Sequence, residues 1–199
     1  VMGGEDWERW LLQLGEAGVL SPNCKTTAYT YIGKELTWPI YGQATIGLAK
    51  EDLDRAASAI MTSLSSLNVS ANVSSLKALV TQASSAIPVM PLYISLIYKV
   101  MKEEGTHEGC IEQITGLFAQ CLYGDNPIQD DMNRFRMDAK ETNEATQAKI
   151  KALWDQVTQD NFHELSDYAG YHQEFLNLFG FGYDGVDYEA DVSPLLDWK

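Results

Sequence analysis

Only two segments of this 199-residue chain have the composition of a buried β-strand, and this scarcity is the strongest limit on its fold. Residues 25–32 (KTTAYTYI) are rich in threonine and tyrosine, have no helical period and end at Gly33. Residues 76–81 (LKALVT) form a short apolar run. Because two strands cannot make a stable sheet on their own, we expect them to complete a sheet whose other strands lie elsewhere.

The rest of the chain is predicted to be mainly helical. Apolar residues recur at helical spacing in six stretches, and glycine or a capping residue bounds most of them. The predicted helices cover residues 7–14 (capped by Asp6), 45–63, 87–104, 106–121, 140–158 and 165–179. Loops are predicted at 63–75 and 125–138, followed by a glycine- and aromatic-rich tail at 180–188. The expected fold class is α/β, predominantly helical, with residues 1–199 forming a single domain or half-domain.

Charge is distributed unevenly along the chain. The net formal charge is −14; residues 1–100 contribute seven basic and eight acidic side chains, and residues 101–199 contribute seven and twenty. This balance argues against a nucleic-acid partner, because a phosphate backbone needs a basic footprint. The acidic second half is either a solvated face or a docking surface for a basic partner. An anionic ligand is expected to bind the nearly neutral first half.

Several classes of site and location are disfavoured by simple patterns. No apolar run approaches the ~18 residues that span a bilayer, so no membrane span is expected. Cys24, Cys110 and Cys121 are odd in number and lack metal-ligand spacing, which fits a reducing compartment and no metal site. The chain has no Walker loop, no Gly-x-Ser-x-Gly and no Gly-x-Gly-x-x-Gly after a strand. The three histidines are scattered and are expected at the surface or at caps.

Tyr41 and Lys50 are the best candidates for chemistry. A lysine ammonium beside a tyrosine lowers the phenol pKa from about 10 and helps it donate to a developing oxyanion. Nine residues apart on one helix, the two side chains would face opposite ways, so Tyr41 must precede the helix that carries Lys50. The alternative is a core tyrosine and an unrelated surface lysine.

Longer motifs relate nearly the whole chain to a known family. They are AYTYIG at 28–33, TIGLAK at 45–50, LVTQASSAIPVMPLY at 79–93, KEEGTHEGCIEQ at 102–113 and LSDYAGYHQEFL at 165–176. With them, the chain resembles the C-terminal half of the NADH-dependent trans-2-enoyl-CoA reductases, which are related to the single-chain bacterial enoyl-ACP reductases. The residues of these motifs are most similar to those of the eukaryotic, mitochondrial branch, and this resemblance implies a mitochondrial matrix location.

The resemblance implies roles for individual residues. Tyr41 and Lys50 match the family's Tyr and Lys separated by eight residues: Tyr41 would protonate or hydrogen-bond the thioester enolate, and Lys50 would hold the nicotinamide ribose of NADH. Tyr31 would help bind the thioester carbonyl. Thr81, Gln82 and Ala83, followed by Ser84, match the loop that flanks the nicotinamide and the substrate. A stretch near 137–141 departs from the family pattern, and we expect it to lie away from Tyr41.

Two functions follow from the resemblance. Members of the family are about twice this length, and the half absent here is the N-terminal dinucleotide-binding half. The chain would then be the C-terminal part of a short-chain-reductase-like doubly wound domain with a helical cap on the substrate side. As an enzyme it would reduce the 2,3 double bond of enoyl-CoA or enoyl-ACP with NADH, in fatty acid synthesis. The alternative is an inactive structural subunit of a larger mitochondrial assembly, such as a respiratory one. In either case a protein partner would cover the missing half.

Overall fold

A small parallel sheet lies at the centre of the first 140 residues. The computed structural model describes residues 3–42 and 45–195. Strands β1 (Lys25–Thr30), β2 (Ser70–Ser75) and β3 (Phe135–Arg136) run parallel in the order β1-β2-β3. Lys25 pairs with Ser70 and Thr30 pairs with Ser75, so β1 and β2 end at the same level. Among the described residues β1 has a neighbour on one side only, and its other edge is open.

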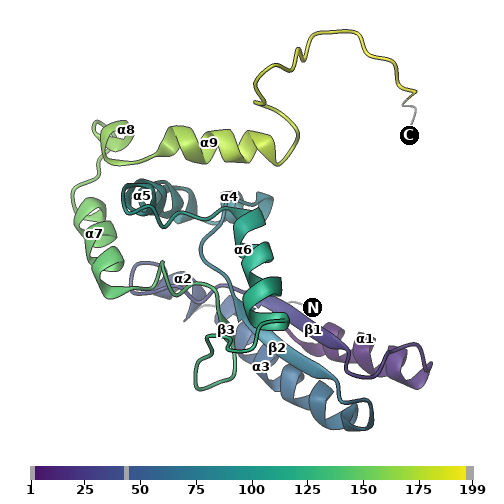
Figure 1. The fold of residues 1–199 in the computed structure, drawn as a ribbon. Helices are drawn as coiled ribbons and strands as arrows, with labels where there is room; N and C mark the ends of the chain where they lie inside the picture. The colour runs from purple at the N-terminus through teal and green to yellow at the C-terminus, as the bar shows by residue number, and fades with distance from the viewer. Residues whose placement is uncertain (1–2, 43–44, 196–199) are drawn as a thin grey trace.

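Helices connect and cover these strands (Figure 1). Their bounds are α1 Glu5–Glu16, α2 Trp38–Tyr41, α3 Thr45–Ser63, α4 Gln82–Ala86, α5 Met90–Glu103, α6 Cys110–Gly116, α7 Glu144–Trp154, α8 Phe162–Leu165 and α9 Tyr168–Asn177, with a 3₁₀ turn at Ser65–Leu67 and a π-helical turn at Leu117–Leu122. Helices α1 and α3 pack together beside the sheet, and α5 packs against α7 and α9 above it. The described part of the tail, residues 180–195, extends away from the body.

Three apolar clusters hold the elements together. Side chains of α1 and α3 pack on β2 around the fully buried Ile60, with Ala71 and Val73 pointing toward them. Helix α5 is buried almost all round, since nine of its residues are inaccessible or nearly so. A smaller cluster around Leu117 and Phe135 packs the π-helical turn against β3. The α5 cluster reaches Tyr41 and Tyr31, so the core extends directly to the candidate site.

The two strand predictions and one loop prediction have different outcomes. The strand at 25–32 is confirmed, ending at Thr30. The strand at 76–81 is wrong: the chain pairs with β1 one segment earlier, at Ser70–Ser75, inside the predicted loop. Small residues dominate this segment because α3 packs closely on it, which conceals the usual β composition. The predicted polar loop 125–138 supplies the two residues of β3.

Helix positions were predicted better than helix ends. The helix at 45–63 is confirmed at both ends. The helix expected at 87–104 is α5, which starts only at Met90 because the φ of 75° at Val89 is not helical; the short α4 precedes it. Asp6 lies inside α1 and caps nothing, and α6 starts at Cys110 rather than after Thr106. Ile111, which belongs to the apolar period of the helix predicted at 106–121, is 76% exposed. The α/β class itself is confirmed.

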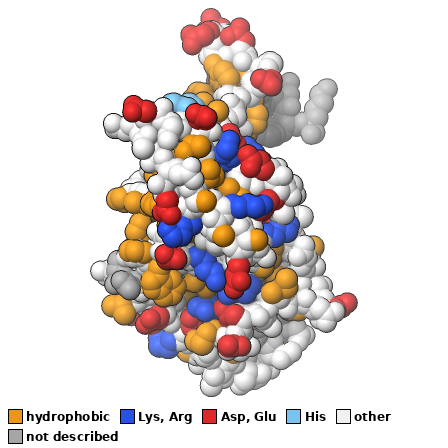
Figure 2. All heavy atoms as spheres, turned by 90° about the vertical axis from the view of Figure 1, so that its left-hand side faces the viewer, with side chains coloured by type: hydrophobic (Ala, Val, Ile, Leu, Met, Phe, Trp, Pro, Cys, Tyr) orange, Lys and Arg blue, Asp and Glu red, His pale blue; other side chains and the backbone are white. Residues whose placement is uncertain are grey.

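Charged groups of both signs are intermixed on one side of the molecule (Figure 2). On α7, which lies on that side in Figure 1, Lys149 pairs with Glu104 at 2.8 Å and Lys151 pairs with Asp155 at 2.9 Å. All three cysteines are free thiols. No helix within residues 3–42 and 45–195 has both the length and the apolar composition needed to cross a bilayer. The same residues hold no group of three or more His, Cys, Asp or Glu side chains placed to bind a metal ion.

Candidate functional site

A cavity of about 190 Å³ opens where β1 and β2 end. The carboxyl ends of parallel strands are where open α/β sheets bind their ligands. Residues following each strand form the walls, together with the end of α2 and the start of α4. The lining residues are Thr30, Tyr31, Tyr41, Leu76, Lys77, Ala78, Leu79, Thr81, Ala83, Ser84, Ile87 and Met90. The wall is therefore mostly apolar, with a few polar groups that converge on it, as in many small-molecule sites.

Tyr41 is the last residue of α2 and therefore precedes the helix that carries Lys50, as its spacing requires. It is 7% exposed, and its ring meets the ring of Tyr31 edge-on with 4.8 Å between centroids. Burial raises the pKa of the Tyr41 phenol, and the negative charge of Glu141 raises it further. The expectation that Lys50 lowers this pKa is wrong. The phenol therefore holds its proton at neutral pH, as a proton donor must, although the raised pKa makes it a weaker acid than a free tyrosine.

Lys50 is the cation beside the cavity. Its Nζ donates to Thr30 Oγ1 at 2.7 Å and lies 5.3 Å from the centre of the Tyr41 ring. Burial lowers the pKa of the Lys50 ammonium to about 8. Because its hydrogen-bonded partner is a neutral hydroxyl, the ammonium keeps donors for a further oxygen ligand, such as a ribose hydroxyl.

Tyr31 follows β1 and lines the same cavity. Its hydroxyl lies 2.9 Å from Glu141 Oε1 and 3.3 Å from Thr37 Oγ1. Gly33 has a φ of +71°, and a Cβ there would lie 2.9 Å from the Tyr31 hydroxyl oxygen and 2.0 Å from Thr37 Oγ1. The glycine is thus needed for both conformation and space. The phenol proton has a partner inside the protein, whereas the expected role is to bind a carbonyl.

The loop predicted to flank a nicotinamide begins α4. Thr81 caps this short helix: its Oγ1 accepts from the Ser84 N–H at 3.0 Å, and Ser84 Oγ accepts from the Thr81 N–H at 2.9 Å. Thr81 and Ala83 line the cavity, while Gln82 is exposed and does not. The structure therefore brings together Tyr31, Tyr41, Lys50, Thr81 and Ala83, and leaves Gln82 outside.

Sequence reasoning missed three residues of this site. Glu141 is fully buried, contacts Tyr31 and raises the pKa of Tyr41, so the expectation that the divergent stretch 137–141 lies away from Tyr41 is wrong. Tyr93, on α5, also donates to Glu141. Lys77 is 3% exposed, and its Nζ donates to the carbonyl oxygens of Ala78 and Glu108, each at 3.0 Å. A lone lysine within the apolar run 76–81 was a usable signal; Glu141 offered none.

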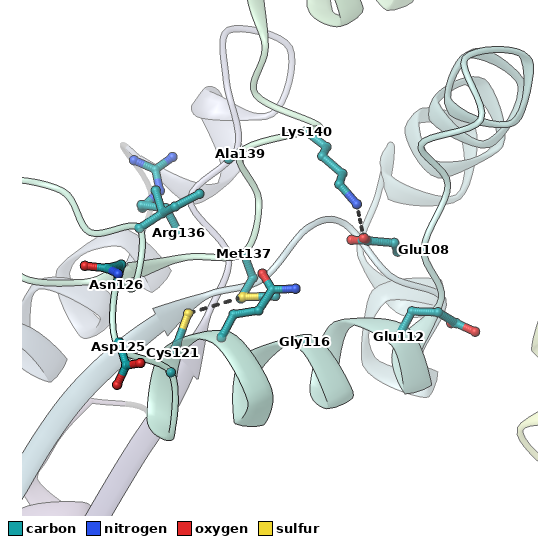
Figure 3. Close-up of a pocket in the computed structure, with 13 residues that line it drawn as sticks. Glu108, Glu112, Gly116, Cys121, Asp125, Asn126, Arg136, Met137, Ala139 and Lys140 are labelled. Atoms are coloured by element: carbon teal, nitrogen blue, oxygen red, sulfur yellow. Dashed lines mark hydrogen bonds and ion pairs between the residues drawn. The ribbon is translucent and has the colours of Figure 1, made fainter.

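A larger cavity of about 450 Å³ lies between α6 with its π-helical turn and residues 124–140 (Figure 3). Lys140 and Glu108 form an ion pair across its mouth, and Cys121 Sγ lies 3.5 Å from Met137 Sδ. Arg136 on its wall is already paired with Asp138. Tyr41 lines the smaller cavity and not this one, so the smaller cavity is the better candidate for proton transfer.

Two protein-family models match this chain. The family model described as the trans-2-enoyl-CoA reductase catalytic region matches residues 1–123, more than half of the chain. The chain belongs to the enoyl reductase family. A second model, described as the enoyl reductase FAD binding domain, matches residues 129–192. The family named from motifs is thereby confirmed.

Known members of the enoyl reductase family resemble the chain over all or nearly all of its length. It is 75% identical over 198 residues to an enoyl-[acyl-carrier-protein] reductase [NADH] of Pseudoalteromonas atlantica, covering 100% of this chain and 50% of the relative. The corresponding protein of Idiomarina loihiensis is 72% identical, with the same coverage. The chain thus spans about half the length of the curated relatives it matches. These relatives are bacterial.

Solved structures of two enoyl reductases superpose closely on the chain. The trans-2-enoyl-CoA reductase of Clostridium acetobutulicum in complex with NADH gives a TM-score of 0.92 at 45% identity, covering 96% of this chain and 49% of that one. The reductase of Treponema denticola in complex with NAD gives 0.89 at 49% identity, covering 96% and 48%. The parallel sheet with its surrounding helices is therefore an enoyl reductase arrangement.

The residues of the second match do not fit a flavin dinucleotide. Residues 129–192 carry fourteen acidic and five basic side chains, a net charge of −9. A pyrophosphate needs cations or a glycine-rich turn at a helix N-terminus. Arg134 and Arg136 are already paired with Asp54, Asp130 and Asp138. The nicotinamide end of NADH fits better, because Lys50 and the Thr81 turn offer donors beside the phenol.

Proposed function

We propose that this chain is the part of an NADH-dependent enoyl-thioester reductase that carries the proton donor. The observation behind the proposal is the cavity at the ends of β1 and β2, where the Tyr41 phenol and the Lys50 ammonium lie together in a chain of the enoyl reductase family. The substrate would be an enoyl-CoA or an enoyl-ACP, reduced at its 2,3 double bond in fatty acid synthesis. The acidic second half of the chain mildly disfavours the acyl carrier protein, which is itself acidic.

The chemistry needs one hydride and one proton. NADH, when bound, supplies the hydride to the β-carbon of the enoyl group. Tyr41 then donates its phenol proton to the enolate, so that the double bond gains one hydride and one proton in total. Lys50 would hold a ribose hydroxyl of the nicotinamide nucleotide with its ammonium, and the Thr81–Ala83 turn would flank the nicotinamide. In the described residues Gln82 points away from this position.

We further propose that the chain is the C-terminal half of a doubly wound reductase domain. The open edge of β1 supports this, since a further parallel strand from the missing half, or from a protein partner, could pair there. Helices α5, α7 and α9 would form the cap over the substrate. A eukaryotic, mitochondrial origin and a matrix location stay predictions from motif wording; cell fractionation with an antibody to this chain would test the location.

NADH oxidation with crotonyl-CoA, measured on the native polypeptide that carries this chain, tests the proposal. Tyr41→Phe should lower kcat by about 10²–10⁴-fold, the usual contribution of a general acid. Tyr183→Phe is the matched control, because this exposed tail phenol donates only to a backbone carbonyl, that of Asn177. Full activity in Tyr41→Phe would overturn the role of Tyr41. No NADH oxidation, together with stoichiometric co-purification of large partners, would instead favour the inactive structural subunit.

A further inference from the structure

A fully buried carboxylate lies behind the candidate site. Glu141 Oε1 accepts hydrogen bonds from the Tyr31 hydroxyl at 2.9 Å and the Tyr93 hydroxyl at 2.8 Å. Its Oε2 accepts from the Ala78 N–H at 2.6 Å. These partners come from the end of β1, from α5 and from the segment after β2, so one side chain joins three walls of the cavity.

The neighbouring groups fix the direction of each hydrogen bond. Gln147 Nε2 donates to the Tyr93 hydroxyl oxygen at 3.1 Å, which leaves the Tyr93 proton for Glu141. An ionised carboxylate only accepts, and here three donors meet it. A protonated Glu141 would have to donate to a phenol oxygen, whereas the ionised form accepts from all three partners. Burial raises the pKa of Glu141, and the positive charge of the buried Lys77, the Ala78 N–H and the two phenols act against this rise.

The consequence falls on Tyr31. A phenol has one proton, and Tyr31 gives it to Glu141, so the hydroxyl offers only acceptor capacity to the cavity. Tyr41 differs, because no residue within 3–42 or 45–195 is hydrogen-bonded to its hydroxyl while its ring touches that of Tyr31. A thioester carbonyl needs a donor, and of the two phenols only Tyr41 has one to offer.

We propose that Glu141 is a positioning residue that withholds the Tyr31 proton from the cavity and leaves Tyr41 as the single phenol that binds the ligand's oxygen. This inference rests on the proposed function, and it replaces the carbonyl-binding role that the resemblance implies for Tyr31. Glu141 itself does not touch the ligand; it acts through Tyr31.

Glu141→Gln tests this by reversing one hydrogen bond at nearly constant shape. The Ala78 N–H needs an acceptor, so the amide oxygen turns toward it and the amide nitrogen faces the two phenols. Tyr31 then accepts from the amide, and its own proton becomes available to the cavity. We expect the Kd for butyryl-CoA, a non-reacting product analogue, to fall by about three- to tenfold in calorimetry, the value of one added hydrogen bond.

The effect must pass through Tyr31. In the Tyr31→Phe background, Glu141→Gln should change the Kd by less than about twofold, since no phenol proton is there to release. A decrease of equal size in both backgrounds would mean that the lost charge acts directly, and would overturn the proposal. So would an unchanged or raised Kd in a folded Glu141→Gln protein. Asp138→Asn is the matched control, because this second buried carboxylate contacts neither tyrosine.

Infrared spectroscopy of the unsubstituted protein gives an answer that does not depend on the variant folding. With ring-labelled tyrosine, the difference between the parent and Tyr31→Phe isolates the phenol C–O band of Tyr31. The band of a donating phenol is expected, and the band of a phenol that only accepts would overturn the assignment. If no variant binds a thioester, the proposed function fails, while this spectrum still decides the bond between Tyr31 and Glu141.

Discussion

Two buried carboxylates only three residues apart lie in opposite surroundings. Asp138 receives Arg136 Nε at 2.7 Å and its terminal nitrogen at 2.9 Å, along with the Ser75 hydroxyl at 2.8 Å. Glu141 receives two phenols and one backbone N–H, all of them neutral. Both side chains are completely inaccessible to solvent. Asp138 is therefore neutralised by a directly bonded guanidinium, whereas Glu141 is held by neutral donors and the buried Lys77 acts on it only through its charge.

This difference indicates two roles. The ion-pair network around Asp138, here called the clamp, is structural, whereas the region around Glu141 belongs to the candidate site. The Asp138 region continues through Arg136 and Asp130 to Arg134 and Asp54, so it ties β3 to α3 and to the end of β2. The Glu141 region contains the groups that titrate abnormally: burial, and then the charge of Glu141, raises the pKa of Tyr31, Tyr41 and Tyr93. A buried charge met by neutral dipoles acts on its neighbours, whereas a buried charge met by an opposite charge mainly holds elements together.

Removing the clamp should have the largest effect on stability. Asp138→Ala leaves Arg136 without its main partner and should lower the free energy of unfolding by about 3 kcal/mol, at the low end for a broken buried pair because Asp130 remains nearby. Urea denaturation measures this. Asp155→Ala, which breaks the exposed pair with Lys151, should cost at most about 0.5 kcal/mol. Equal losses in the two variants would show that Asp138 clamps nothing.

The role of Lys50 at the cavity can be tested by measuring how activity depends on pH. Lys50 is charged below its pKa of about 8 and neutral above it, so activity that needs the ammonium falls as pH rises through about 8. The decline should approach tenfold per pH unit, as for any single essential proton. Lys50→Met should not show this decline, and its residual activity should vary little between pH 7 and about 9. A decline that survives in Lys50→Met belongs to another group.

The Glu141 region should tolerate loss of a single neutral donor better than the clamp tolerates loss of its charge. Tyr93→Phe removes one of the three hydrogen bonds to Glu141 and should cost about 1 kcal/mol in urea denaturation. The exposed Tyr29, whose hydroxyl has no partner among the described residues, provides the control as Tyr29→Phe. A cost as large as that of Asp138→Ala would remove the contrast between the two carboxylates.

The smallest effect is expected in the tail, which lies outside both regions. Phe181 is 53% exposed, and Phe181→Ser should change the free energy of unfolding of these residues by no more than about 0.5 kcal/mol. The same substitution in a longer native polypeptide is the informative comparison. A loss above about 1 kcal/mol there would mean that the tail packs on a surface outside this chain.

Local patterns predicted the parts of the molecule that local physics determines. The helix at 45–63 follows from its apolar period, and the place of Tyr41 before that helix follows from its spacing to Lys50. The strand β2 could not be recognised, because its sequence SANVSS reflects close packing against α3 rather than β-propensity. Glu141 could not be recognised either: its partners lie 48 to 110 residues away, so its burial depends on tertiary structure alone.

The open edge of β1 has a consequence for handling the protein. Every second residue of this six-residue strand presents unpaired backbone N–H and C=O groups there, and Lys25 is the single charged side chain of β1. Such an edge is a template for any extended chain that meets it, including another copy of itself. When nothing covers this strand, aggregation through edge-to-edge pairing competes with folding, and the competition becomes more severe as the protein concentration rises.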